Sequence, residues 1–584
     1  MANARSFMVA RTGLMGSGTN GMSADELLEI MCANSADRTA SIYNEDITDV
    51  AAGTFGMPSS NRVIGVNNWI QDAVLPNCES VGNCSFYACK SMTNLELPAL
   101  VTCGSYAFYN CSALEELELP NCTTLKAHAF GLCSGLKRLS LPALTSVSTS
   151  AFSNLSSLEE LDLGDCVGHS ISLTGANPSG FTVRIKNGAS DSSSYGLLSS
   201  IPATVTGPVK IVFYGDKIGN WVLYGQTHEI QVEASDSVTT IGDGSFASCT
   251  GLTDLPSLPG VTSWSKSCFS GCGGLTSITI PRTIDKLPHS CFLGCTGLTS
   301  VVVPENVTQL ESLCFGNITA RIDFYGPVRS IKTYTSGVLG NGEVHFHNEE
   351  IPAYAFHYDQ TSECDVVIED TVKHVNIGCF YGCSKIKSVT IGKGVTSWTT
   401  PGGGTSQTFS GCIGLTSVII KEGLTTLKGA YMFYRCTALT EIVIPDSVTI
   451  LGDNMFSFCT ALSSVTLSRS LSELPGECFQ SCESLASIVI PDSVVSLGGD
   501  CFSRCIGLTT ITIPEHMTTI GIGCFSNCTG LTSMTVLAVT PPQTGRDAFS
   551  GVNKEIPVYV PAGSVSAYRA SSRWSEFTNI QAIP

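Results

Sequence analysis

Short alternations of apolar and polar residues recur along the chain, and many of them end at a proline. Three representative segments read Leu275-Thr-Ser-Ile-Thr-Ile-Pro281, Leu439-Thr-Glu-Ile-Val-Ile-Pro445 and Leu508-Thr-Thr-Ile-Thr-Ile-Pro514. Alternation over about six residues predicts a β-strand with one apolar face. Proline has no N–H to donate to a strand ladder, so we expect each strand to end there.

Two further features accompany each alternation. A Val-x-x-Leu-Gly segment follows, as in Val448–Gly452 and Val494–Gly498, and its glycine suits a tight corner. A phenylalanine comes next, usually with cysteine three residues later. The phenylalanines fall in three runs. The spacing is 22 residues in the first run, 23 in the second, and mostly 23 or 24 in the third, which has one step of 29. The 17 anchors are Phe86, Phe108, Phe130, Phe152, Phe246, Phe269, Phe292, Phe315, Phe356, Phe380, Phe409, Phe433, Phe456, Phe479, Phe502, Phe525 and Phe549.

One strand and one corner per period cannot enclose a core alone, but stacked copies can, which is the principle of a solenoid. Apolar strand positions then point inward, and each phenylalanine stacks on its copy one coil away. Trp264 and Trp398 occupy frame positions usually taken by Ile or Leu, so we expect them in the core. The representative structural core residues are Phe269, Phe292, Phe456, Phe479, Phe502 and Phe525.

The complete frame, Leu-x-x-Ile-x-Ile-Pro-x-x-Val-x-x-Ile-Gly-x-x-Cys/Ala-Phe-x-x-Cys, resembles the BspA-type leucine-rich repeat over roughly residues 75–165 and 235–550. The segment from Ile556 to Ile580 resembles the end segment of such arrays. The resemblance implies an α/β-type repeat solenoid, predominantly β, forming a leucine-rich-repeat superhelix with one short strand per coil of roughly 23 residues. It also implies a surface protein of the kind found in gut and oral bacteria and in some mucosal protozoa.

The repeat pattern divides the chain into five predicted regions. They are an N-terminal capping or attachment segment (1–70), a first repeat block (71–165), degenerate coils or an insert (166–235), a second repeat block (236–550) and a C-terminal cap (551–584). Strand-like pieces persist in the third region, which favours degenerate coils over a separate domain. The inserted run at 399–406 explains the 29-residue step as a loop grown from one coil.

The N-terminal segment contains Ser23-Ala-Asp-Glu26 before two leucines, which predicts a short helix over about 24–33. This helix and Trp69 can cap the first coil, since a solenoid needs its open end covered. The alternative is that the segment docks onto another structure.

The outward strand positions differ between the two repeat blocks. The first block offers an acidic stripe, and the second offers Ser, Thr and Val, including Val443 and Val489. The stripe is either a solvated face or a binding site for a basic partner or Ca²⁺. The Ser/Thr surface keeps strand propensity and can also hydrogen-bond sugars. The candidate binding residues are Glu96, Glu116, Glu118, Glu160, Asp162, Thr279, Thr466, Thr510 and Thr512.

Composition and the absence of certain motifs argue against several classes of function. Charged residues make up only 14% of the 584 residues, and the net charge of −18 disfavours binding to nucleic acid. No apolar run approaches the roughly 18 residues that span a bilayer, so we expect no membrane insertion. Phosphate-binding loops, His-Glu-x-x-His and nucleophile-elbow motifs are absent from the sequence, so we expect neither an enzyme nor a cofactor.

The 27 cysteines mostly follow the repeat frame, with 13 placed three residues after the anchor and 7 directly before it. We interpret them as a buried ladder of small apolar side chains, with disulfides and metal as the weaker alternatives. The histidines His345, His347 and His357 cluster locally, but no cysteine frame accompanies them, so no metal site is predicted.

The predicted function is recognition or adhesion, in which the extended sheet and its loops bind a protein or glycan on a host or bacterial surface. The N-terminus lacks the apolar segment of an export signal, which BspA-like surface proteins normally carry. Three explanations are a removed signal, an intracellular interaction scaffold, or a bacteriophage tail adhesin attached through its N-terminal segment. An extracellular location is expected, whereas the ligand and the oligomeric state are left open.

Overall fold

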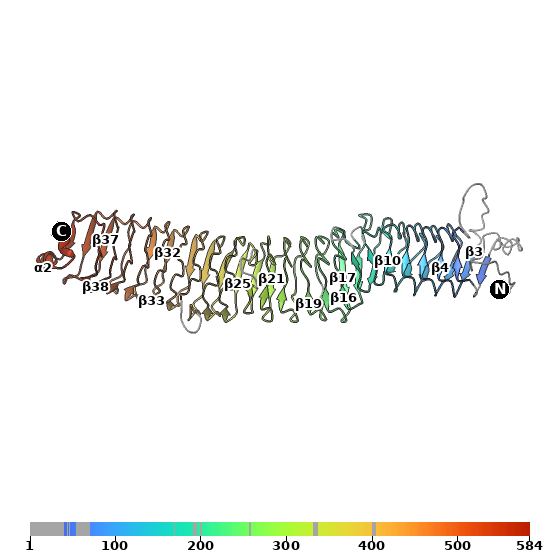
Figure 1. The fold of residues 1–584 in the computed structure, drawn as a ribbon, viewed down its shortest axis with the longest axis horizontal. Coiled ribbons are helices and arrows are strands. Elements are labelled where there is room, and N and C mark those ends of the chain that lie inside the picture. The colour runs from blue at the N-terminus through green and yellow to red at the C-terminus, as the bar shows by residue number, and fades with distance from the viewer. Residues whose placement is uncertain are drawn as a thin grey trace. The chain divides into compact units, whose positions relative to one another are not determined.

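The structure is a computed structural model that describes residues 40–43, 45, 47–53, 70–168, 170–190, 195–198, 201–255, 258–330, 337–399 and 405–584. The helix predicted at 24–33 and Trp69 lie outside these residues, as does most of the proposed attachment segment. The chain forms two compact units, and each is a stack of coils (Figure 1). The first runs to Thr283 and includes Gly294–Gly297, and the second comprises Ile284–Leu293 and Leu298–Pro584.

A typical coil contributes one strand of three to five residues and a second strand of two residues, each paired in parallel with the next coil. The longer strand comes from the apolar alternation, as in β37 (Thr510–Ile513), and confirms the predominantly β repeat solenoid. The two-residue strand, such as β38 (Thr519–Ile520), comes from the segment before the corner glycine. The prediction of one short strand per coil therefore holds for the main sheet, and the structure adds a narrow second ladder.

In the first unit, the longer strands form two parallel sheets and the shorter strands form two more. The longer strands are β1 (Ala40–Tyr43), β3 (Ile70–Val74), β5 (Asn94–Glu96), then β7 (Glu116–Glu118), β9 (Arg138–Ser140), β11 (Glu160–Asp162), β13 (Phe181–Ile185), β15 (Val209–Phe213) and β17 (Ile230–Ala234). The shorter strands are β2 (Asp49–Val50), β4 (Ser80–Val81), β6 (Thr102–Cys103), β8 (Thr124–Leu125), β10 (Ser146–Val147), β12 (Val167–Gly168), β14 (Ala189–Ser190), then β16 (Lys217–Ile218), β18 (Thr240–Ile241) and β19 (Ser263–Trp264).

In the second unit, the longer strands are β21 (Ser300–Val303), β23 (Arg321–Phe324), β25 (Glu343–Phe346), β27 (Asp365–Ile368), β29 (Ser388–Ile391), β30 (Ser417–Ile420), β32 (Glu441–Val443), β34 (Ser464–Thr466), β37, β39 (Ser533–Val536), β41 (Val558–Val560) and β42 (Ile580–Ala582). The shorter strands are β20 (Lys286–Leu287), β22 (Gln309–Leu310), β24 (Arg329–Ser330), β26 (Glu350–Ile351), β28 (His374–Val375), β31 (Thr426–Leu427), β33 (Ile450–Leu451), β35 (Glu473–Leu474), β36 (Ser496–Leu497), β38 and β40 (Gln543–Thr544).

The stretch 166–235, where the sequence repeat fades, still forms coils. Strands β13, β15 and β17 continue the parallel sheet that begins at β7, with Val183 paired to Ile211 and Ile211 to Val232. These inward residues are buried although the phenylalanine anchor is absent. The pairing favours the interpretation as degenerate coils over a separate inserted domain.

The phenylalanine anchors form stacked rows in the interior of each unit. In the second unit, the ring centroids of Phe456 and Phe479 lie 5.6 Å apart, and those of Phe479 and Phe502 also lie 5.6 Å apart. The six representative core rings are fully buried, as are most of the strand positions expected to point inward. Trp264 and Trp398 are buried as well.

At every anchor except Phe152, the loop that carries the phenylalanine has a left-handed backbone two residues before and two residues after the ring, whereas at Phe152 only Asn154, two residues after it, is left-handed. Around Phe479 these residues are Glu477 (φ 54°) and Ser481 (φ 57°). Their N–H groups donate to the next coil at 2.8 Å, to the carbonyl oxygens of Gly499 and Ser503. The loops therefore add another backbone ladder, and these inter-coil bonds accompany the uncommon φ values.

The corner glycine is required by close stacking of coils. A Cβ on Gly498 would lie 2.4 Å from the nitrogen of Gly476 in the preceding coil, although Gly498 does not have a positive φ. From the sequence, glycine is expected at this position for its conformational freedom in a tight corner. The structure instead gives steric exclusion as the reason.

The C-terminal segment closes its sheet with a short helical connection. After β41, the chain forms two 3-10 turns, η2 (Ala562–Ser564) and η3 (Trp574–Glu576), around the helix α2 (Val565–Ala570), and then returns as β42. Tyr568 and Trp574 are fully buried, and Trp574 packs 4.9 Å from the ring of Phe549, the last anchor.

Candidate functional site

The side chains that face solvent from the longer strands form two parallel columns in each unit, because each strand presents two outward positions. In the sheet from β7 to β17, the first column consists of Glu116, Arg138, Glu160, Thr182, Lys210 and Gln231. The second column consists of Glu118, Ser140, Asp162, Arg184, Val212 and Glu233.

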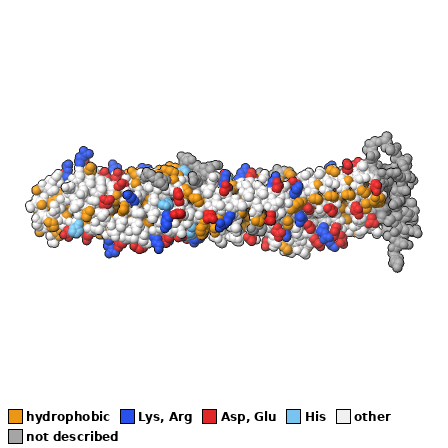
Figure 2. All heavy atoms as spheres, turned by 90° about the horizontal axis from the view of Figure 1, so that it is seen from below, with side chains coloured by type: hydrophobic (Ala, Val, Ile, Leu, Met, Phe, Trp, Pro, Cys, Tyr) orange, Lys and Arg blue, Asp and Glu red, His pale blue; other side chains and the backbone are white. Residues whose placement is uncertain are grey.

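The predicted acidic stripe is interleaved with cations. Arg138 lies between Glu116 and Glu160 in the register and forms an ion pair with Glu116. Arg184 Nε lies 3.5 Å from Glu160 Oε1. On the face that Figure 2 shows, acidic and basic side chains are likewise intermixed. The opposite charges offset the repulsion expected between carboxylates one coil apart, so the stripe is less anionic than its sequence indicates.

Asp162 is held by its own neighbours. Its Oδ1 accepts hydrogen bonds from the Tyr214 hydroxyl at 2.8 Å and from the Gly164 N–H at 2.9 Å. Burial and the adjacent carboxylate raise the pKa of Tyr214, so this hydroxyl keeps its proton and remains a donor. Of the remaining predicted acidic residues, Glu96 and Glu118 are exposed on β5 and β7.

The predicted threonines of the second unit and Thr279 of the first are all exposed. Thr466 lies on β34 opposite Val443, and Thr510 and Thr512 lie on β37 opposite Ser533 and Thr535. These residues occupy the two outward columns and are hydrogen-bond donors and acceptors on a rigid ladder. The predicted acidic residues lie on other strands, β5, β7 and β11.

Exposed aliphatic side chains share one outward frame position with these threonines. The exposed fractions are 55% for Ile419, 57% for Val443 and 82% for Val489. We name this row the aliphatic–threonine column, which comprises Ile419, Val443, Thr466, Val489, Thr512 and Thr535. The two valines were predicted to point outward, but Ile419 was not. Val418, Ile419 and Ile420 form a continuous apolar run, so no alternation marks Ile419 as an outward residue.

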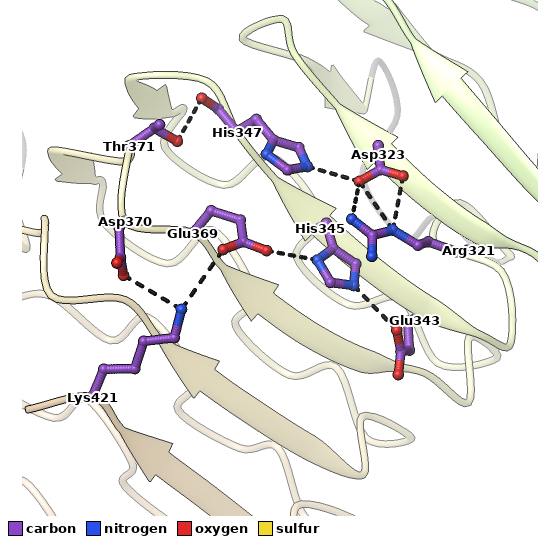
Figure 3. Close-up of polar contacts among 9 residues, drawn as sticks. All are labelled: Arg321, Asp323, Glu343, His345, His347, Glu369, Asp370, Thr371 and Lys421. Carbon is purple, nitrogen blue, oxygen red and sulfur yellow. Dashed lines mark hydrogen bonds and ion pairs between the residues drawn. The ribbon is translucent and has the colours of Figure 1, made fainter.

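Charged and polar side chains gather on the neighbouring strands β23 and β25 and directly after β25, β27 and β30 (Figure 3). Arg321 makes a forked contact with Asp323, with nitrogen–oxygen distances of 2.7 and 2.9 Å. His347 Nε2 lies 2.7 Å from Asp323 Oδ1, and His345 Nδ1 lies 2.8 Å from Glu369 Oε1. His357, which the sequence grouped with these histidines, instead contacts the carbonyl oxygen of Tyr354.

The cluster shifts the acidity of its carboxyl groups. Burial alone would raise the pKa of Asp323, but hydrogen bonds from Arg321 and His347 hold it below its usual range. The hydrogen bond from His345, together with the charge of Lys421, lowers the pKa of Glu369. Both carboxylates therefore keep their charge at neutral pH.

The carboxylates of this cluster were not predicted from the sequence. An alignment of successive coils on their inward residues reveals Asp323, since Ile322-Asp323-Phe324 and Val344-His345-Phe346 fall in register. An outward Asp thus lies beside an outward His from the next coil.

The 26 cysteines among the described residues are free, and all but Cys84 are buried. Many of those that follow a phenylalanine donate a thiol hydrogen bond to the anchor carbonyl of the preceding coil. For example, Cys505 Sγ lies 3.1 Å from the Phe479 oxygen, and Cys133 Sγ lies 3.0 Å from the Phe108 oxygen. Burial raises the pKa of Cys459 to about 12, so this thiol is protonated and can donate. The cysteine ladder is thus a structural feature of the interior.

Comparison with known proteins identifies the repeat. The profile described as BspA type Leucine rich repeat region, in 6 copies, matches residues 67–170, 216–335, 349–429, 404–509 and 427–556. Among curated proteins there is no match. No helix of the described residues is long and apolar enough to cross a membrane.

Several solved structures are similar to this chain. A leucine-rich repeat protein from Bacteroides ovatus is 17% identical, with 75% of this chain and 82% of that one covered and a TM-score of 0.29. A leucine rich cell surface protein from Faecalibacterium prausnitzii is 24% identical, with 56% and 78% covered and a TM-score of 0.24. A leucine-rich repeat protein from Eubacterium ventriosum is 21% identical, with 51% and 82% covered and a TM-score of 0.28.

The repeat fold identified here presents extended ladders of side chains. Leucine-rich repeat proteins are typically interaction and adhesion modules, and theirs is a non-enzymatic recognition fold. BspA-type members are often cell-surface proteins. Because the profile matches well over half of the residues, the chain belongs to the BspA-type leucine-rich repeat family.

Proposed function

We propose that this chain is a non-enzymatic adhesion protein that binds a protein on a host or bacterial surface through the aliphatic–threonine column. The observation that carries the proposal is the exposure of Ile419, Val443 and Val489 at one repeating frame position. A sheet face that only meets water is usually polar. Exposed apolar residues that form a row, with polar residues beside them, are typical of interaction sites.

The surroundings of the column suit a protein partner. The other outward position of the same strands is polar, as with Ser417, Glu441 and Ser464, and can hydrogen-bond around an apolar centre. Successive coils place these side chains about 4.8 Å apart. Parallel backbone pairing joins two pairs of neighbours in the column, Val443 with Thr466 and Thr512 with Thr535, and limits their motion, which lowers the entropy lost on binding.

Direct binding to purified surface and matrix proteins tests the proposal, with the full chain immobilised on a sensor surface. The test variant combines Ile419→Thr, Val443→Thr and Val489→Thr. Threonine already occupies this frame position at Thr466 and Thr512, so strand pairing is preserved. We expect the variant to lose at least about tenfold in affinity for any partner found, since each aliphatic side chain contributes to burial at the interface.

A matched control replaces three exposed isoleucines outside the column, with Ile450→Thr, Ile506→Thr and Ile522→Thr. The control should bind like the unmodified chain. Equal loss in both variants, or no loss in the first, would contradict the proposal. A glycan array run in parallel covers the alternative ligand: glycan binding that survives the column variant would place recognition elsewhere.

A further inference from the structure

Three potential metal ligands lie on one outward face of adjacent strands in the second unit. Asp323 on β23 is paired in register with His345 on β25. His347 follows two residues after His345, so its side chain emerges on the same side. The ring of His347 stacks on Tyr325, with centroids 4.6 Å apart. Parallel pairing of two coils therefore places the carboxylate beside two imidazoles.

The ligand atoms of these residues converge. One carboxylate oxygen of Asp323 and one ring nitrogen from each of His345 and His347 lie within 4.8 Å of one another. Among the described residues, this is the one group of three or more His, Cys, Asp or Glu side chains arranged in this way. Asp323 and His345 are each only 7% exposed, so bulk water competes weakly for the site.

The contacts of His345 leave one of its nitrogens in need of a cation. Its Nδ1 lies 2.8 Å from Glu369 Oε1 and its Nε2 lies 3.2 Å from Glu343 Oε2. A neutral imidazole carries one N–H, so it can donate to only one of the two carboxylates. With Nδ1 donating to Glu369, the Nε2 lone pair faces the carboxylate of Glu343. Either a second proton on the ring or a metal ion on one of its nitrogens resolves this opposition between two acceptors.

The surrounding residues orient the three potential ligands. A metal-bound histidine usually donates its other N–H to a carboxylate, and Glu369 and Glu343 are the two carboxylates placed to accept one from His345. The guanidinium of Arg321 holds Asp323 at two points. Tyr325 fixes the ring plane of His347. Contacts from outside the group thus support the orientation of all three side chains.

The charge of the cluster matches a divalent cation. Lys421 lies 3.7 Å from Glu369 and 3.4 Å from Asp370, and it is the second cation of the network. With both imidazoles neutral, four carboxylates and two cations leave a formal charge of −2. These residues are Asp323, Glu343, Glu369, Asp370, Arg321 and Lys421.

We infer that Asp323, His345 and His347 form a binding site for Zn²⁺, bridging β23 and β25. Two imidazoles with one carboxylate favour zinc over Mg²⁺ or Ca²⁺, which prefer oxygen ligands. Zinc bonds of about 2.0–2.1 Å place tetrahedral ligands about 3.3 Å apart, so the 2.7 Å contact between His347 Nε2 and Asp323 Oδ1 opens on binding.

Equilibrium dialysis of the full folded chain against Zn²⁺, under reducing conditions, tests this site. We expect one tightly held Zn²⁺ per chain. Asp323→Asn and His347→Gln should each weaken binding at least about tenfold, because each removes one ligand. His357→Gln is the matched control, since it removes a histidine of the same unit whose contacts are a backbone carbonyl and the rings of Tyr354 and Tyr358. Circular dichroism confirms that each variant is folded.

X-ray absorption at the zinc edge provides a second readout that separates this site from the cysteines. Nitrogen and oxygen neighbours without sulfur are expected, because the described thiols of the cluster's unit are buried. Sulfur ligands, an unchanged affinity in both ligand variants, or the absence of zinc binding would each overturn the inference. The site is independent of the proposed partner surface, so the column variant should retain its zinc.

Discussion

The sheet from β7 to β17 in the first unit and the sheet from β21 to β30 in the second have the same kind of interior but differ on their outward faces. Both bury aliphatic strand residues. Outward, the first carries Glu116, Arg138 and Glu160 as alternating charges, whereas the second carries a histidine–carboxylate cluster and then exposed Ile419. The repeat therefore constrains the inward residues of each coil, whereas the outward residues can differ between the two units.

The physical reason is the difference between packing and solvation. An inward side chain contacts the equivalent residues of the neighbouring coils, so a change in its volume disturbs the packing of those coils. An outward side chain meets water and two neighbours in its column, and most substitutions there cost little. Function can thus differ between units that fold by the same rule.

The largest expected effect concerns the thiols, which should be equally protected in both units. Burial raises the pKa of Cys249 in the first unit and Cys459 in the second to about 12. At about pH 8, a pKa of 12 leaves roughly one thiol in ten thousand ionised, and the thiolate is the reactive form. Alkylation mapped by mass spectrometry should therefore modify both only on unfolding, after the half-buried Cys84. Rapid labelling of only one of these two cysteines would show that the two interiors are not equally protected.

The next effect is the loss of a stacked ring. Phe108 lies 5.3 Å from Phe86 and Phe130, and Phe479 is similarly placed between its own neighbours. Phe108→Ala and Phe479→Ala should each lower the free energy of unfolding by about 3–5 kcal/mol through cavity formation. Chemical denaturation measures this cost. Val489→Ala, at an exposed position, should cost under about 0.5 kcal/mol. A small effect of either phenylalanine change would contradict the stacked core.

A smaller effect separates two adjacent glycines. A Cβ at Gly498 would meet the preceding coil at 2.4 Å, whereas one at Gly499 would lie 3.4 Å from its nearest contact, the Ile522 oxygen. Gly498→Ala should therefore cost about 1–3 kcal/mol through steric overlap. Gly499→Ala should be nearly neutral. The two midpoints in one denaturant titration give the comparison, and equal values would disprove close stacking as the reason for the corner glycine.

The smallest effect tests the charged face of the first unit. Glu116 and Glu118 lie on the same strand, but Glu116 pairs with Arg138 while Glu118 lies opposite Ser140. Glu116→Lys should cost up to about 1 kcal/mol more than Glu118→Lys, because it replaces an exposed ion pair with repulsion. The difference should shrink at high salt. Thermal unfolding at two salt concentrations measures it, and a salt-independent difference would rule out the pairing.

Most of the fold could be predicted from the sequence, because the repeat multiplies a weak local signal. The alternation around Ile511 and Ile513 predicts a strand whose bounds the structure reproduces as β37. The two-residue ladders such as β38 were harder to foresee, since so short a segment has no periodicity. Left-handed residues such as Glu477 were also unpredictable, because glutamate gives no local signal for a positive φ.

The candidate sites were less predictable than the fold. The acidic stripe was visible in sequence, yet its pairing with Arg138 and Arg184 depends on which coil lies beside which. The cluster of Asp323 with His345 and His347 was missed for the same reason, since Asp323 lies 22 residues before His345 and 24 before His347. Residues so far apart become neighbours only when the coil closes in register.

The sequence by itself determined the repeat, the inward residues and the family, because these depend on periodicity along one chain. Only the tertiary structure decided which outward side chains meet, since a column is made of residues from successive coils. It also decided why Gly498 is glycine and what the buried thiols donate to. The physical reason is that local propensity acts between residues near in sequence, whereas ion pairs, ligand sets and steric limits act between residues near in space.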